Sequence, residues 1–424
     1  MDSTYTNSLE SQISSENPDK PSQVLEYMTF FPTFMNILNT LTGPEVLSVS
    51  NSMTLIGLVY SISMMVGTTI LSYLGTIIVL KLRESVDAES INELATKIVG
   101  KWCGNAYSIL TLCFTYSCQV AYLFIGADSI IKWADLLGLH GWDHGMKRAL
   151  LVLIYALVLP VLLTIPRELK ILSIVSTGAI LCQVLYVSGM IYEAIRIFPS
   201  KGIDPSCESY IGGLVFFNAF AIYSMLYAFP SVVLPLVRYY HPDMRKRYFL
   251  IGSSFVACFS ITIIPGTIGY LLFGAGTNQI VISSFPNNDI FMQIVRVGFF
   301  IVVNASFAVV SITVMQDISS ICYKVQNPAD LPFWKRLSAL IISNAPPVII
   351  AMFMLEIRPA FEVGGAFGGC LSNFFVPPLL YVILSKKKWY TPLNILMLMF
   401  SLFGLVSAII ATYQAVVDAM HPDS

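Results

Sequence analysis

The sequence predicts an all-α polytopic membrane protein with about eleven transmembrane helices. Its 424 residues are 56% hydrophobic and 12% charged, and their mean hydropathy is +0.73. Soluble domains carry about 25% charged residues, so a soluble globular fold is excluded. Residues 27–80 contain a single charge, Glu45, which directly follows Gly43-Pro44. This stretch is long enough for two bilayer crossings of about 20 residues each.

The chain divides into a short polar tail and one long apolar domain. Residues 1–26 are rich in Ser, Asn and Glu and lack the pattern of a secretory signal peptide, so they predict a disordered cytosolic tail. Residues 27–424 predict one integral membrane domain. Its eleven apolar segments lie at about 28–53, 56–80, 104–131, 149–165, 171–195, 211–237, 248–273, 290–316, 336–354, 359–384 and 391–416. Helices 1–5 therefore cover about 28–195, helices 6–10 about 211–384, and helix 11 about 391–416.

The distribution of basic residues sets the predicted orientation. With the N-terminus in the cytosol, 17 of the 24 Lys and Arg fall in inside segments, 6 fall outside and 1 falls within a span. Cytosolic connections of membrane proteins carry an excess of Lys and Arg. We therefore expect the N-terminus and the Lys386–Lys388 connection in the cytosol, and Cys207 and the C-terminal tail on the outside.

Two spans carry helix-breaking residues at corresponding places. Span 1 contains Gly43-Pro44, and span 6, five helices later, contains Pro230 and Pro235. A break at membrane depth survives only where protein or a water-filled cavity lines it, and paired broken helices form the substrate site of many secondary transporters. The pattern predicts two inverted five-helix repeats plus one extra helix, with a solute site between the breaks.

The chemistry of this break suits a solute that carries a carboxylate and an ammonium group. Free amides at a half-helix start stabilise a carboxylate, and unwound carbonyls suit an ammonium group or a cation. Pro44 fits the first position of the second half-helix, where its missing N–H costs nothing, so Glu45 is expected in the first turn. One interpretation of Glu45 is a stabilising charge at a helix start. The other is a protonation or cation site.

The second interpretation rests on the depth of Glu45 in the membrane. Low-dielectric surroundings favour the neutral form of a carboxyl group, so Glu45 is expected to exchange a proton during transport. An ionised Glu45 would instead repel a substrate carboxylate and favour a cationic amine as the substrate.

Short motifs from span 1 to span 7 resemble the amino acid/auxin permease family. Span 1 reads Asn39-Thr-Leu-Thr-Gly43-Pro-Glu-Val46-Leu47-Ser48, which is similar to the family pattern N-x-x-x-G-x-G-[IV]-L-[SG]. Further matches, in order along the chain, are Ser90-Ile-Asn-Glu93-Leu94-Ala95, Pro166-Arg167-Glu-Leu169-Lys-Ile-Leu172, Val233-Leu234-Pro235-Leu236 and Gly269-Tyr270-Leu271-Leu272-Phe273-Gly274. The chain thus resembles a family that includes proton- and sodium-coupled neutral amino acid transporters.

The resemblance implies an eleven-helix amino acid transporter that uses a H⁺ or Na⁺ gradient. It implies substrate contacts from Asn39, Gly43, Pro44, Glu45, Val46 and Ser48 in span 1, and from Phe220, Tyr223, Ser224 and Tyr227 in span 6. It also implies a Na⁺ site between spans 1 and 8, and Ser306, Ser311 and Thr313 of span 8 are the candidate ligands. Glu45 is the alternative residue for ion coupling. The family usually has a small residue where this chain has Glu45.

Other functional classes find less support in the residues. The four His all fall in predicted loops or in the tail, so we expect no metal site and no catalytic residues, and the chain is not expected to be an enzyme. A net charge of −1 argues against nucleic acid as a partner. The expected partners are an amino acid and the lipid bilayer, with no cofactor besides the coupling ion. A transporter-like amino acid sensor is the alternative function, and both the plasma membrane and a vacuolar or lysosomal membrane fit the sequence.

Overall fold

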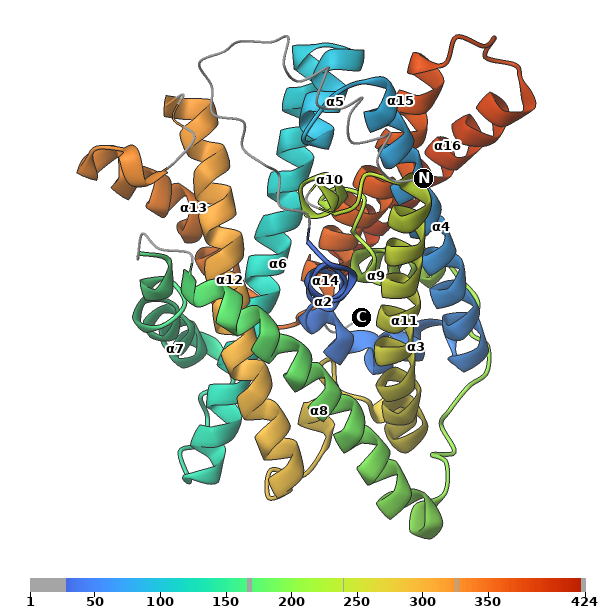
Figure 1. Cartoon of the computed structure of the whole chain (residues 1–424). Helices are drawn as coiled ribbons and strands as arrows, with labels where there is room; N and C mark the ends of the chain where they lie inside the picture. Colours follow the sequence, from blue (N-terminus) through green and yellow to red (C-terminus); the bar gives the residue numbers. More distant parts are fainter. Residues whose placement is uncertain (1–27, 166–169, 239, 324, 326–327, 421–424) are drawn as a thin grey trace.

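The computed structural model describes residues 28–165, 170–238, 240–323, 325 and 328–420, and these ranges fold as a helical bundle (Figure 1). The predicted tail, residues 1–26, lies outside the described residues. Nine helical segments of the described chain are long and apolar enough to cross a membrane. They are α4 (Leu58–Ser85), α6 (Lys101–Leu136), α7 (Gly145–Val158) with η2 (Leu162–Thr164), α8 (Lys170–Lys201), α11 (Met244–Phe273), α12 (Ile290–Tyr323), α13 (Phe333–Phe353), the segment Arg358–Leu384, and α16 (Pro392–Met420).

The other two spans are interrupted, as predicted. Span 1 consists of α2 (Phe30–Leu41), the 3₁₀ turn η1 (Pro44–Ser48) and α3 (Val49–Ile56). Span 6 consists of α9 (Val215–Leu226) and the short α10 (Val233–Val237). Together with the nine continuous segments they make the eleven predicted spans, and the two breaks lie in the first helix of each five-helix half.

Span 10 is helical throughout but changes its winding in the middle. It begins as α14 (Arg358–Gly364), continues as the π-helix η6 (Gly365–Phe375) and ends as α15 (Val376–Leu384). Two glycines bring η6 directly against α9. A Cβ at Gly365 would overlap the carbonyl oxygen of Ala221, and a Cβ at Gly369 would overlap the side chain of Ser224. The π-helix therefore approaches the first half of span 6 more closely than any larger side chains would allow.

One short helix, α5 (Ile91–Ile98), lies in the connection between spans 2 and 3, where no helix was predicted. Ser90 Oγ accepts from the N–H of Glu93 at 3.2 Å, and Glu93 Oε2 accepts from the N–H of Glu89 at 2.8 Å. This is a variant of the capping box, because the Glu93 carboxylate reaches the residue before the N-cap and not the N-cap itself. The Glu89 amide, helped by Lys97 at 2.8 Å, lowers the pKa of the Glu93 carboxyl. Residues next to one another in the sequence therefore stabilise the start of this helix, which lies at the end of the bundle.

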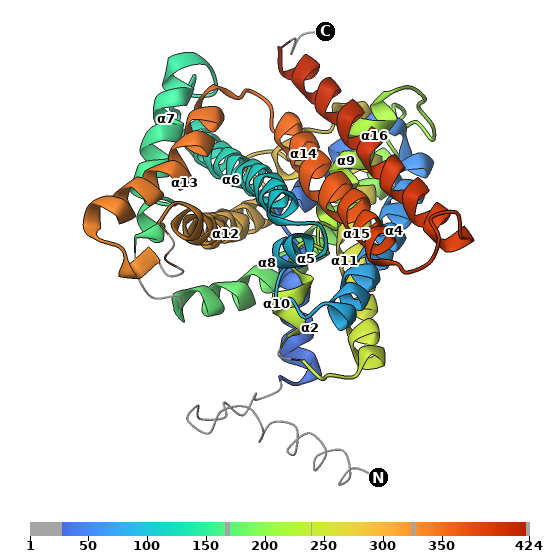
Figure 2. The ribbon, with the colours of Figure 1, turned by 90° about the horizontal axis from the view of Figure 1, so that it is seen from above.

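The ends of the bundle separate the segments predicted to lie on opposite sides of the membrane. Figure 1 shows α5 and the connection between α15 and α16 at one end, and the last turns of α8 at the other. Seen along the bundle, α7 and α13 lie at one edge and α4 and α16 at the opposite edge (Figure 2). Both predicted cytosolic connections thus share one end of the molecule.

Cysteine labelling from each side of the membrane checks this orientation. Cys207 itself is a poor probe, because burial raises the pKa of its thiol and the thiolate is the reactive form. In a cysteine-free background we expect a membrane-impermeant maleimide to label Lys201→Cys and Ser424→Cys from outside, and Lys387→Cys only after permeabilisation. Labelling of Ser424→Cys only after permeabilisation would contradict the predicted odd number of crossings.

Candidate functional site

The break in span 1 follows from three consecutive residues. The helix α2 ends at Leu41, and Gly43 continues the chain in an extended conformation with φ −89° and ψ −176°. Pro44 then opens η1 at its first position, and Glu45 lies in the first turn, so both predictions for these residues are confirmed. Because the helix stops here, the last carbonyl groups of α2 have no partner within their own helix.

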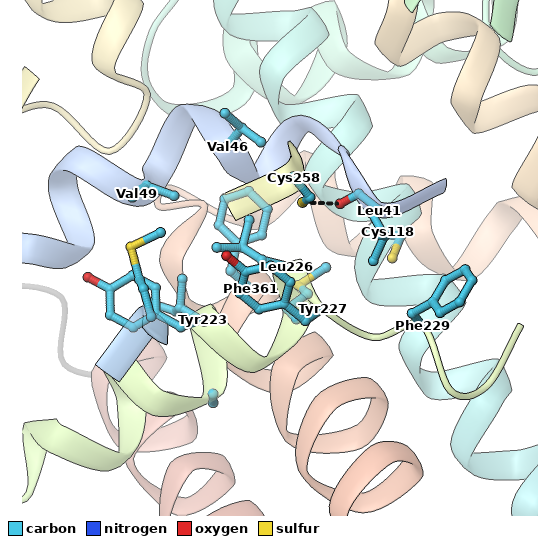
Figure 3. Close-up of a cluster of buried hydrophobic side chains, with 14 of the residues drawn as sticks. Leu41, Val46, Val49, Cys118, Tyr223, Leu226, Tyr227, Phe229, Cys258 and Phe361 are labelled. Atoms are coloured by element: carbon cyan, nitrogen blue, oxygen red, sulfur yellow. Dashed lines mark hydrogen bonds between the residues drawn. The ribbon is translucent and has the colours of Figure 1, made fainter. Parts of the chain in front are cut away.

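Side chains from other spans meet these freed carbonyl groups. The Cys258 thiol of α11 donates to the carbonyl oxygen of Leu41, with 3.7 Å between sulfur and oxygen (Figure 3). The amide nitrogen of Gln183, on α8, donates to the carbonyl oxygen of Thr42 at 3.5 Å. The break is therefore lined by protein groups, as a break at membrane depth requires.

Glu45 turns its carboxylate back toward the break. A Cβ at Gly43 would overlap this carboxylate, which places it directly over the extended backbone. It acts electrostatically on Cys118 and Tyr122 of α6 and on Cys258 of α11, all of them uncharged groups. None of the ion pairs found among the described residues includes Glu45.

The break in span 6 lies close to the break in span 1. Two of its aromatic residues, Tyr223 and Tyr227, are fully buried between the two broken spans (Figure 3). The Tyr223 hydroxyl faces Ser52 of α3 and Ser61 of α4, and the ring of Tyr227 stacks on Phe255 with 6.0 Å between centroids. The structure thus brings these two predicted residues to the site.

The other two predicted residues of span 6 lie on a different side of α9. Phe220 packs against Phe374 of η6 and Phe403 of α16, at centroid distances of 5.7 and 5.0 Å. Ser224 lies against Gly369 and gives its hydroxyl hydrogen to the carbonyl of Phe220 at 2.6 Å. Both residues face spans 10 and 11 and not the break in span 1.

The remaining predicted residues of span 1, Asn39, Val46 and Ser48, have different surroundings. Asn39 is half-buried in the last turn of α2, and Val46 is fully buried in the apolar core of the site. Ser48 Oγ donates to the backbone carbonyl of Gln279 at 2.6 Å. Ser48 is therefore engaged by the connection between α11 and α12, which covers this end of span 1.

That connection is fixed to spans 1 and 10 by side-chain hydrogen bonds. Asn51 Nδ2 donates to the carbonyl of Thr277 at 2.7 Å, and Arg358 Nη2 donates to Asn51 Oδ1 at 3.1 Å. Gln279 Oε1 accepts from the N–H of Ile357 at 2.8 Å. These bonds close the end of the site next to α3.

The candidate sodium ligands of span 8 are not gathered at the break. Ser311 Oγ donates to Asn344 Oδ1 of α13 at 2.8 Å. Thr313 is exposed on the bundle surface and donates to the carbonyl of Val309 in its own helix at 3.1 Å. Ser306 is half-buried. In the part of the chain that the structure describes, no three His, Cys, Asp or Glu side chains are placed to hold a metal ion.

Sequence reasoning missed two amide residues that contact the breaks, Gln183 and Asn373. Asn373 Nδ2, on η6, donates to the carbonyl oxygen of Tyr227 at 2.9 Å. Both amides stand in predicted spans, at 171–195 and 359–384, in which most residues are apolar. Polar residues of this kind hydrogen-bond to neighbouring helices within membranes, and this signal would have indicated them.

Comparisons with known proteins agree with the arrangement of the spans. A family model described as transmembrane amino acid transporter protein matches residues 27–417. Sodium-coupled neutral amino acid transporter 7 of Xenopus laevis is 22% identical over an alignment of 385 residues, which covers 84% of this chain and 81% of that protein. Solute carrier family 38 member 8 of Homo sapiens is 25% identical over 310 residues, covering 68% of this chain and 67% of that protein.

A yeast protein and a solved structure extend the comparison. Vacuolar amino acid transporter 4 of Saccharomyces cerevisiae is 23% identical over an alignment of 285 residues, which covers 64% of this chain and 38% of that protein. The manganese transporter of Eremococcus coleocola superposes with a TM-score of 0.56 at 15% identity, covering 96% of this chain and 91% of that one. At this identity the superposition shows a common fold alone.

Proposed function

This chain belongs to the transmembrane amino acid transporter family, and on that premise we propose that it carries amino acids across a membrane by secondary active transport. The substrate binds between the two breaks, and access alternates around them. Backbone groups at 42–43 and 227–232 lie outside regular helices, so they can supply donors for a carboxylate and acceptors for an ammonium group.

We propose the proton as the coupling ion and Glu45 as the residue that carries it. The supporting observation is that the Glu45 carboxylate lies over the extended backbone at Gly43, near the uncharged side chains of Cys118, Tyr122 and Cys258. It takes part in none of the ion pairs found among the described residues. A proton bound there would remove the repulsion toward an incoming substrate carboxylate. Proton and amino acid would then raise each other's affinity, as linkage between two sites requires.

Sodium coupling is the second candidate, because one relative is named as sodium-coupled. Its ligands would come from spans 1 and 8, with Ser306, Ser311 and Thr313 as the hydroxyl groups. Since Thr313 is exposed on the bundle surface, the proton is the better supported of the two ions.

Uptake into proteoliposomes separates these possibilities. With no Na⁺ present, we expect radiolabelled amino acids to accumulate inside the proteoliposomes when the pH outside is lower than the pH inside. A Na⁺ gradient imposed at equal pH should give only equilibration. Accumulation with Na⁺ alone would contradict proton coupling, and uptake of no amino acid under either gradient would contradict the proposed function.

A further inference from the structure

Two buried amides occupy corresponding places in the two five-helix halves. Gln183 lies on span 5, the last helix of the first half, and Asn373 lies on span 10, the last helix of the second half. Each amide donates to a backbone carbonyl in the broken first helix of its own half. Thr42 directly follows the last residue of α2, and Tyr227 directly follows the last residue of α9. The two contacts are therefore equivalent under the inverted repeat.

The hydrogen-bond chemistry fixes how each amide is oriented. A backbone carbonyl can only accept, so the nitrogen of the amide must face it and the amide oxygen must face elsewhere. Gln183 Oε1 and Asn373 Oδ1 have no hydrogen-bond partner in the described structure, and their residues are 1% and 0% exposed. A buried acceptor without a donor is unfavourable, and its presence twice, at equivalent positions, calls for a common role.

We propose that Gln183 and Asn373 are a pair of positioning residues for solute binding, each holding the freed carbonyl group at one break. This inference rests on the proposed function. Without the amide, the Thr42 carbonyl loses its side-chain donor, and the Tyr227 carbonyl keeps only the backbone N–H of Phe229, at 2.7 Å. The unwound segment is then held less firmly in one geometry. The nitrogen-to-oxygen distance is 2.9 Å for Asn373 and 3.5 Å for Gln183. Because shorter hydrogen bonds are stronger, Asn373 has the larger effect.

Transport kinetics of single variants test the pair. We expect Asn373→Leu to raise the KM for amino acid uptake about tenfold, the effect of losing one buried hydrogen bond, with little change in maximal rate per molecule. Gln183→Leu should raise the KM about threefold.

The matched control is Asn394→Leu in α16. Asn394 is also a buried amide, 1% exposed, and it donates to a backbone carbonyl, that of Lys388, at 3.1 Å. Its carbonyl partner lies in the connection between α15 and α16, far from both breaks in sequence. We expect its KM to match that of the parent. A rise in KM equal to that of Asn373→Leu would overturn the specific role of the pair.

Hydrogen–deuterium exchange gives a readout that does not depend on transport. In the reconstituted full chain, Asn373→Leu should increase exchange only in peptides covering 226–233, and Gln183→Leu only in those covering 41–49. Equal increases at both breaks in each variant, or exchange and KM both unchanged, would overturn the inference. Faster local exchange with an unchanged KM would also overturn it, since the amides would then be structural alone. If the parent transports no amino acid, the proposed function fails and the exchange pattern alone decides whether the amides hold the breaks.

Discussion

Glu45→Gln is expected to abolish the accumulation of amino acid against its gradient while preserving exchange of amino acid across the membrane. A pH difference of one unit supplies about 1.4 kcal/mol per proton and supports about tenfold accumulation. The variant resembles the protonated carboxyl permanently, so it binds substrate but can no longer release the proton. Uptake by the parent should rise as the pH outside the proteoliposomes falls, because the protein with a protonated Glu45 carboxyl binds the substrate.

The measurement is uptake and counter-exchange of one radiolabelled amino acid in proteoliposomes over a series of imposed pH gradients. Glu93→Gln provides the control, because it removes a surface carboxylate in α5 that already carries a local capping role. It should keep the pH dependence of the parent. If Glu45→Gln accumulates substrate with that same dependence, Glu45 is a helix-end charge. If the parent ignores pH and follows Na⁺, the site between spans 1 and 8 becomes the coupling hypothesis.

Gly43→Leu is expected to reduce uptake about hundredfold, the cost of displacing reacting or binding groups by about 1 Å, while the protein still reaches the membrane. The reason is steric and not conformational. Gly43 has an extended backbone that any residue adopts, with φ −89° and ψ −176°. A side chain there would occupy the space of the Glu45 carboxylate and force it away from the break.

Gly67→Leu in α4 is the matched control, because a Cβ at Gly67 meets nothing within 4 Å. Initial uptake rates normalised to the amount of protein in the membrane provide the comparison. We expect Gly67→Leu to keep a rate close to that of the parent. A Gly43→Leu variant with a near-normal rate would place the substrate site away from span 1.

The fold was largely predictable because its strongest signals are local. Long apolar runs define the continuous spans, and Gly43-Pro44 and Pro230 interrupt the other two where the structure does, whereas Pro235 lies within α10. The helix α5 was missed although its capping box, Ser90 and Glu93, is visible in the sequence. It is short and lies between spans, where hydropathy carries no signal.

The site was predictable only along the two broken spans. Tyr223 and Tyr227 are buried between the two broken spans, whereas Phe220 and Ser224 lie on another face of the same helix. The assignment of all four residues to substrate binding stays a prediction. A sequence does not fix the rotation of a helix that is apolar on all sides. Gln183 and Asn373 were missed because their contacts cross 141 and 146 residues of sequence. The assignments of Glu45, Ser306, Ser311 and Thr313 to ion coupling stay predictions.

The contact of the π-helix with α9 determines which parts can move as rigid bodies. At Gly365 and Gly369 the backbone of η6 touches α9 without intervening side chains, so sliding between them would cause overlap. The short α10 packs instead against α2 and α4. Any rearrangement of span 6 must then turn about the hinge at 227–232. Paired spin labels should accordingly keep a constant separation between α9 and span 10, and change it between α9 and α10.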